Sequence, residues 1–123
     1  MQLRLVRTRD GERWTFPKRR QGPDGSPGEA AALAAAQQAG VTGVVADNPF
    51  TEFRYARRMS DVAQAFLIAV QSVAPSAEPG RQPTWFDLHD AHRRVAEGRD
   101  PGQAQDMQRV LLLVEHELPE RLS

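Results

Sequence analysis

The chain has 123 residues, no cysteine, and sixteen basic residues balanced by sixteen acidic ones. The length fits a single domain over residues 1–123, and the balanced charge provides no global field that would favour nucleic acid or an anionic membrane. Without cysteine there is no disulfide framework, thiol nucleophile or thiolate metal site. No apolar run approaches the ~20 residues of a membrane span, and the N-terminus lacks an apolar signal core, so we expect a cytoplasmic protein.

The first part of the chain predicts a hairpin. Residues 2–7 alternate between polar and apolar side chains, with Leu3 and Leu5 on one face, as in a strand. Asp10 and Gly11 form a turn signal, and residues 14–16 read as the returning strand.

A helix is predicted between Ser26 and Gly40. Ser26 can cap it, Pro27 suits the first helical position, and Glu29 stands where a capping box has its acid. Gly40 can end it in a left-handed conformation. The helix is almost entirely alanine, with Leu33 as its only bulky anchor, so we expect it to lie close to a sheet.

The second half predicts further strands and two helices. Asp61–Val73 is the strongest strand candidate, although part of it also fits a helix. The predicted elements, in chain order, are a strand over 41–45, an aromatic and basic segment over 50–58, the strand over 61–73, a loop over 74–83, a strand over 84–88, a helix over 89–97, a break over 98–102 and an amphipathic helix over 103–118 with Val110, Leu111, Val114 and Leu118 inward.

Residues 14–41, WTFPKRRQGPDGSPGEAAALAAAQQAGV, resemble the Nudix box of Nudix hydrolases, a strand–loop–helix–loop unit that wraps around a diphosphate. The positions that match the frame of this motif are Trp14, Phe16, Pro17, Lys18, Ser26, Pro27, Ala30, Ala31, Gly40 and Val41. The resemblance implies an α/β (α+β) fold in which a mixed β-sheet is sandwiched between the alanine-rich helix and the C-terminal helices. A strand usually precedes the one over 3–7 in this family, and Met1 leaves no room for it here. Either the sheet is one strand short or a second copy supplies the missing edge, and because an unpaired edge is a template for strand addition we predict a homodimer.

The chemical residues of the motif are absent. The loop glutamate of the family is Gly25, its arginine–glutamate pair is Leu33–Ala34, and its metal-binding glutamate pair is Gln37–Gln38. Magnesium prefers carboxylate and phosphate oxygens, and a neutral glutamine cannot act as a general base. We therefore predict no catalytic residue, no metal ligand and no cofactor.

Basic and amide side chains remain as candidates for binding a phosphorylated ligand. Cations in the diphosphate loop can replace magnesium through charge-assisted hydrogen bonds, although a solvated basic loop paired with Asp24 or Glu29 is the alternative. The aromatic and basic residues after residue 50 can stack a base and hold a phosphate, or place a core face against a solvent face. The candidate ligand-binding residues are Lys18, Arg19, Arg20, Gln37, Gln38, Arg54 and Tyr55.

Three functions follow from these patterns. The first is an inactive Nudix-like domain that binds a nucleotide-like ligand or a protein partner, with no membrane and no specific nucleic acid as partner. The second is an active magnesium-dependent pyrophosphohydrolase whose ligands have moved to Glu52, Asp61 or Asp87. The third is a purely structural dimerising module.

His89 and His92 share a helical face but lack a third ligand, so they are a weak zinc signal.

Overall fold

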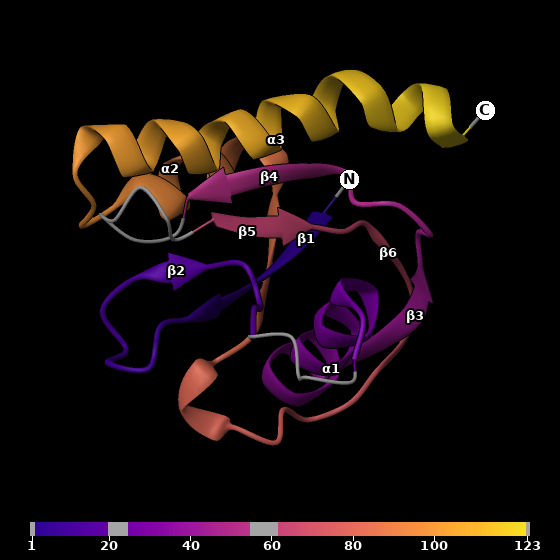
Figure 1. Cartoon of the computed structure of the whole chain (residues 1–123). Coiled ribbons are helices and arrows are strands. Elements are labelled where there is room, and N and C mark those ends of the chain that lie inside the picture. Colours follow the sequence, from indigo (N-terminus) through magenta and orange to yellow (C-terminus); the bar gives the residue numbers. More distant parts are fainter. Residues whose placement is uncertain (1, 20–24, 55–61, 123) are drawn as a thin grey trace.

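The computed structural model describes residues 2–19, 25–54 and 62–122, which form an α+β fold (Figure 1). The elements in chain order are β1 (Gln2–Arg7), β2 (Trp14–Thr15), α1 (Pro27–Ala39), β3 (Val41–Val45), β4 (Thr51–Arg54), β5 (Val62–Ala65), β6 (Ile68–Val73), the short 3-10 helix η1 (Pro79–Arg81), β7 (Thr84–Asp87), α2 (Leu88–Ala96) and α3 (Pro101–Leu122).

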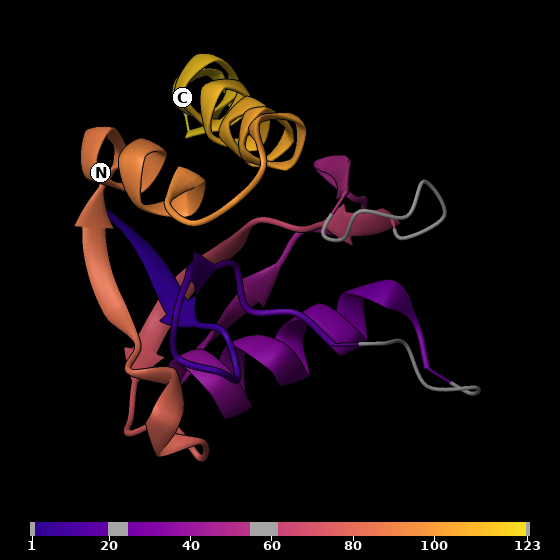
Figure 2. The same cartoon turned by 90° about the vertical axis from the view of Figure 1, so that its left-hand side faces the viewer.

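The strands lie between α1 on one side and α2 and α3 on the other (Figure 2). The alternation of β1 connects the two sides. Leu5 is buried in a cluster with residues of α2 and α3, and Leu3 packs against the same cluster. Val6 points the other way and packs with Ala35 and Ala39 of α1. The predicted placement of Leu3 and Leu5 on one face is confirmed.

The strand pairings differ from the expected mixed sheet. Every pairing among the described strands is antiparallel, in the order β2–β1–β7 for one sheet, with β3–β6 and β4–β5 as two further pairs. β1 has a partner on both sides, because its end (Val6 and Arg7) pairs with β2 and its beginning (Gln2–Leu5) pairs with β7. The expected open edge beside residues 3–7 is therefore wrong, since β7 returns from late in the chain to lie there.

The predicted single strand over 61–73 is interrupted. β5 and β6 are separated at Phe66 and Leu67, and their partners β4 and β3 are separated by residues 46–50. The Ala46 N–H donates to Leu67 O and the Phe50 N–H donates to Ala65 O, so the two pairs form one bent antiparallel ribbon. Three residues, Asp47–Asn48–Pro49, stand opposite the single Phe66 at the bend. This unequal length, together with a proline that has no N–H to donate, breaks the strand.

α1 begins and ends as predicted. Ser26 Oγ accepts from the Glu29 N–H at 3.2 Å, and Gly40 has a φ of 67°, in the left-handed region. The inward face is made by small side chains, Ala30, Ala34, Ala35 and Ala39, together with Gln38. The expectation that Leu33 anchors this helix is wrong: Leu33 lies on the opposite side and is 47% exposed. Close approach of the helix leaves no space for a bulky side chain underneath it.

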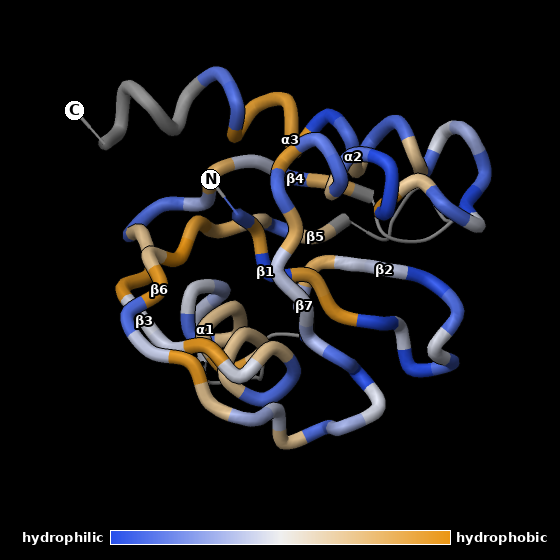
Figure 3. The backbone as a smooth tube through the Cα atoms, turned by 180° about the vertical axis from the view of Figure 1, so that it is seen from behind, coloured by the Kyte–Doolittle hydropathy of each residue, from blue (hydrophilic) through white to orange (hydrophobic). Residues whose placement is uncertain are grey.

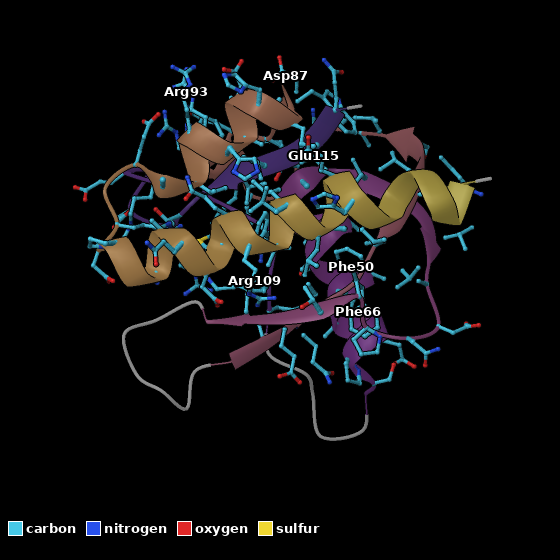
Figure 4. The ribbon with its side chains drawn as sticks, turned by 90° about the horizontal axis from the view of Figure 1, so that it is seen from above. Phe50, Phe66, Asp87, Arg93, Arg109 and Glu115 are labelled. Carbon is cyan, nitrogen blue, oxygen red and sulfur yellow. The ribbon has the colours of Figure 1, made fainter. Side chains whose placement is uncertain are left out.

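The C-terminal helices cover the other side. Asp87 caps α2 by accepting from the Asp90 N–H at 2.8 Å, and α3 begins at Pro101, two residues before the predicted start. Val110, Leu111 and Val114 are buried as predicted, with Met107 added to the same face. The side chain of Leu118 lies outside the described residues. Arg109 reaches from α3 to β4 (Figure 4), where it donates to Thr51 Oγ1 and to the Glu52 carbonyl oxygen.

We expect Gly40→Ala to lower the free energy of unfolding by about 2 kcal/mol or more, since a non-glycine residue at positive φ is strained. Its Cβ would also overlap the carbonyl oxygen of Ala74. Urea unfolding followed by circular dichroism measures this. Gly11→Ala is the matched control, because Gly11 also has a positive φ but open space around it; we expect it to lose only about 1 kcal/mol. Equal losses for both variants would contradict the role given to the Ala74 contact.

Candidate functional site

The structure brings four of the predicted ligand-binding residues together, where the loop after β2 runs alongside the last turns of α1. Lys18 and Arg19 belong to the loop, and Gln37 and Gln38 belong to the helix. Gln38 forms two hydrogen bonds to the backbone of Lys18: its Oε1 accepts from the Lys18 N–H at 3.2 Å, and its Nε2 donates to the Lys18 carbonyl oxygen at 2.8 Å. Arg19 Nη1 donates to Gln37 Oε1 at 2.9 Å.

Gln38 is buried, with only 7% of its surface exposed. The neighbouring Gln37 is exposed. The amide of Gln38 satisfies the backbone donor and the backbone acceptor of one residue, Lys18, as a neighbouring strand would do. A carboxylate offers only acceptors when ionised, so a glutamate here could not bond to the Lys18 carbonyl oxygen. The side-chain amide of Gln38 therefore links the loop to helix α1.

Lys18 lies in a crowded cationic environment. Partial burial is the largest cause that lowers the pKa of its ammonium, and the positive charges of Arg99, Arg81, Arg13 and Arg9 lower it further. A nearby positive charge disfavours the charged form of a basic group, and so lowers its pKa. The same effect acts on Arg99, whose pKa is lowered by burial and then by Arg13.

The backbone anchors two of these arginines. Arg99 donates from Nε to the Val95 carbonyl oxygen and from Nη2 to the Trp14 carbonyl oxygen, both at 2.8 Å. Arg81 donates to the Arg7 carbonyl oxygen at 3.2 Å and forms an ion pair with Glu78 at 3.1 Å. Both guanidinium groups are thereby held in place beside the β1–β2 hairpin.

Sequence reasoning missed Arg81 and Arg99, because they lie far from Lys18 along the chain. A weaker signal for a basic region was present in the first twenty residues. Seven of the sixteen basic residues lie there, but only two of the sixteen acidic ones. The net charge of the whole chain is zero, so it does not reveal this uneven distribution. The excess of basic residues lies on the β1–β2 hairpin and the loop that follows it.

The carboxylates proposed for a relocated metal site are dispersed. Glu52 lies on β4 and is exposed, and Asp87 caps α2 (Figure 4). In the part of the chain that the structure describes, no three or more histidine and acidic side chains gather into a group able to hold a metal ion. Asp61 lies outside the described residues.

The aromatic and basic segment after residue 50 contributes to the core at one position. Phe53 is buried, and its ring meets that of Phe16 edge to face at 5.3 Å. Arg54 ends β4, but its side chain, together with Arg20 and Tyr55, lies outside the described residues. The burial of Phe53 favours a core face over a base-stacking face for this strand.

No protein-family model matches this chain, and no curated protein matches its sequence. Within residues 2–19, 25–54 and 62–122, no helix combines the length and the apolar character that crossing a membrane requires.

We expect Gln38→Glu to lower the free energy of unfolding by about 1–3 kcal/mol, the usual result of leaving a buried polar group without its partner. Gln37→Glu is the matched control on the next residue. It places the same charge on an exposed side chain, and its carboxylate still accepts from Arg19, so a change within about 0.5 kcal/mol is expected. Urea unfolding of both variants at neutral pH measures these changes in the free energy of unfolding. Equal stability of the two variants would contradict the proposal that the Gln38 amide holds the loop against the helix.

Proposed function

We propose that this chain is a ligand-binding domain related to the Nudix fold that binds a phosphorylated small molecule, of the nucleotide type, without hydrolysing it. The main support for this proposal is the concentration of positive charge around Lys18. Its ammonium is partly buried, and the positive charges of four arginines act on it. Two of these arginines are paired with carboxylates, Arg81 with Glu78 and Arg13 with Asp10. An anion beside Lys18 would still be attracted by the neighbouring positive charges. The resemblance of residues 14–41 to a diphosphate-binding motif supports a phosphate as that anion.

The chemistry of the cations suits this ligand. Arginine binds phosphate oxygens with two parallel N–H groups, and such charge-assisted bonds are about twice as strong as neutral ones. Arg19 is exposed and held by Gln37 through only one of its guanidinium nitrogens. Arg81 and Arg99 are already positioned by carbonyl oxygens, so little side-chain freedom would be lost on binding.

The same residues argue against hydrolysis. Activation of water for attack on a diphosphate needs a metal or a general base. The helix offers Ala34, Gln37 and Gln38 where the family has carboxylates, and the amide of Gln38 is engaged by the loop. A ligand bound here would therefore remain intact.

We expect inorganic pyrophosphate and ADP-ribose to bind the purified protein in the absence of magnesium, measured by isothermal titration calorimetry. Arg19→Ala should weaken binding about five- to tenfold, because one charged hydrogen-bonding group is lost. Arg93→Ala is the matched control. It removes an exposed arginine of α2 that is paired with Asp90 at 2.7 Å, and the affinity should be unchanged.

Two results would overturn the proposal. Phosphate release that requires magnesium or manganese and disappears in Glu52→Ala would establish an active enzyme with relocated ligands. The absence of binding by every phosphorylated compound, with the protein folded, would leave a structural role.

The affinity should also depend on pH. A bound anion favours charged Lys18, but the pKa of Lys18 in the free protein lies below its ordinary value of 10.5. Binding should therefore weaken as the pH rises through this lowered pKa. Lys18→Arg keeps its charge over the whole range, so its affinity should persist at pH values where the wild type has lost affinity. Titrations between about pH 7 and 11 test this, and identical profiles for both proteins would exclude Lys18 from the site.

A further inference from the structure

The outer strand of the β3–β6 ribbon is exposed on both of its faces. Val70 and Val73 stand opposite Gly43 and Val41, on the face toward α1, yet they are 39% and 54% exposed. The helix covers β3 but does not extend over β6. On the other face Val44, which pairs with Ala69, is 60% exposed. Figure 3 shows these apolar segments of β3 and β6 at the periphery of the molecule.

This region carries no charge. Charged residues make up 26% of the chain, but there is none between positions 30 and 46 and none between positions 62 and 77. α1, β3 and β6 thus meet in a neutral, apolar region, whereas the loop at Lys18 and Arg19 is basic. A partner recognised by its charge would find no counter-ion here.

The free edge of β6 lacks most of the devices that prevent strands from associating. Natural edge strands are usually protected by charged side chains, proline or a bulge. β6 has neither a charged residue nor a proline, and it pairs only with β3 among the described strands. One register shift occurs opposite Thr42 and Gly43 and leaves Gln71 without a cross-strand partner. This irregularity limits hydrogen bonding along the edge, so valine side chains must supply a large part of any contact.

We propose that β6 is the contact surface for a second copy of this chain, with the two β6 strands antiparallel across a twofold axis. Such a contact is self-complementary: Val70 of each copy would lie opposite Val73 of the other. A neutral strand can approach its own copy without repulsion, whereas like charges directly opposite one another destabilise a strand pair. The proposal concerns a different face from the ligand site and does not depend on it.

The size of the surface predicts a weak dimer. Six residues extend about 20 Å at ~3.3 Å each, and pairing along one edge buries less than the ~800 Å² per partner of a stable interface. We therefore expect a dissociation constant in the micromolar range or weaker, with monomer and dimer in rapid exchange.

Sedimentation equilibrium of the full chain at rising concentration tests this. The expected average mass rises from 13.7 kDa toward twice that value. Val73→Lys should weaken the association at least about tenfold, because each twofold contact then places two charged side chains against the apolar Val70 of the other copy. Leu112→Lys is the matched control, since Leu112 lies on α3 and is 47% exposed; its association should equal that of the wild type. Circular dichroism checks that all variants are folded.

The absence of cysteine permits a second, independent measurement. Gln71→Cys places the only thiol of the chain near the proposed axis, at an exposed residue in the middle of β6. Mild oxidation should convert this variant to a disulfide-linked dimer faster than Leu112→Cys at the same concentration. A wild type that stays monomeric up to ~500 µM, equal association of Val73→Lys and wild type, or equal crosslinking of the two cysteine variants would each overturn the proposal. Arg19→Ala should leave all of these results unchanged, which separates a failure here from a failure of the ligand site.

Discussion

The pair of hydrogen bonds between the side chain of Gln38 and the backbone of Lys18 is the constraint on which this molecule depends. It joins the loop after β2 to the last turn of α1, two segments twenty residues apart in the chain. Together with the bond from Arg19 to Gln37 Oε1, this pair of bonds holds the loop beside the helix. The two bonds together require an amide, because an ionised glutamate at position 38 could accept from the Lys18 N–H but could not donate to the Lys18 carbonyl oxygen.

The local structure was largely predictable from the sequence, because short-range signals determine it. The cap at Ser26, the end of α1 at Gly40 and the inward face of α3 all follow from residues within one or two helical turns. The sequence predictions were wrong at positions whose structure depends on contacts between elements that are far apart in the chain. Leu33 appeared to be an anchor because it is the most bulky apolar side chain of its helix, but the inward face consists of four alanines and Gln38. The strand over 61–73 appeared continuous because its interruption depends on the longer connection between β3 and β4, which contains Pro49.

The candidate site was predictable in part for the same reason. Its location followed from a motif within 28 residues, and four of its members do lie together. The contributions of Arg81 and Arg99 could not be predicted, because they depend on bonds to the Arg7 and Trp14 carbonyl oxygens from the other half of the chain. The burial of Gln38 was missed because polarity alone suggests exposure, whereas an amide that pairs with a peptide unit is stable inside a protein.

The last turn of α1 also connects two regions that are otherwise separate. The Gln37 carbonyl oxygen accepts from Ser76 Oγ and from the Ala77 N–H, and the Gly40 carbonyl oxygen accepts from the Ala74 N–H, so the segment that leaves β6 is tied to the helix end beside the basic loop. A displacement of this turn would therefore move both the basic loop and the segment that leaves β6. Thermodynamic linkage is reciprocal: if occupancy of one region shifts the turn, occupancy of the other must change by the same factor. The end of α1 thus joins the basic loop, through Gln37 and Gln38, to the segment that follows β6, through Gln37 and Gly40.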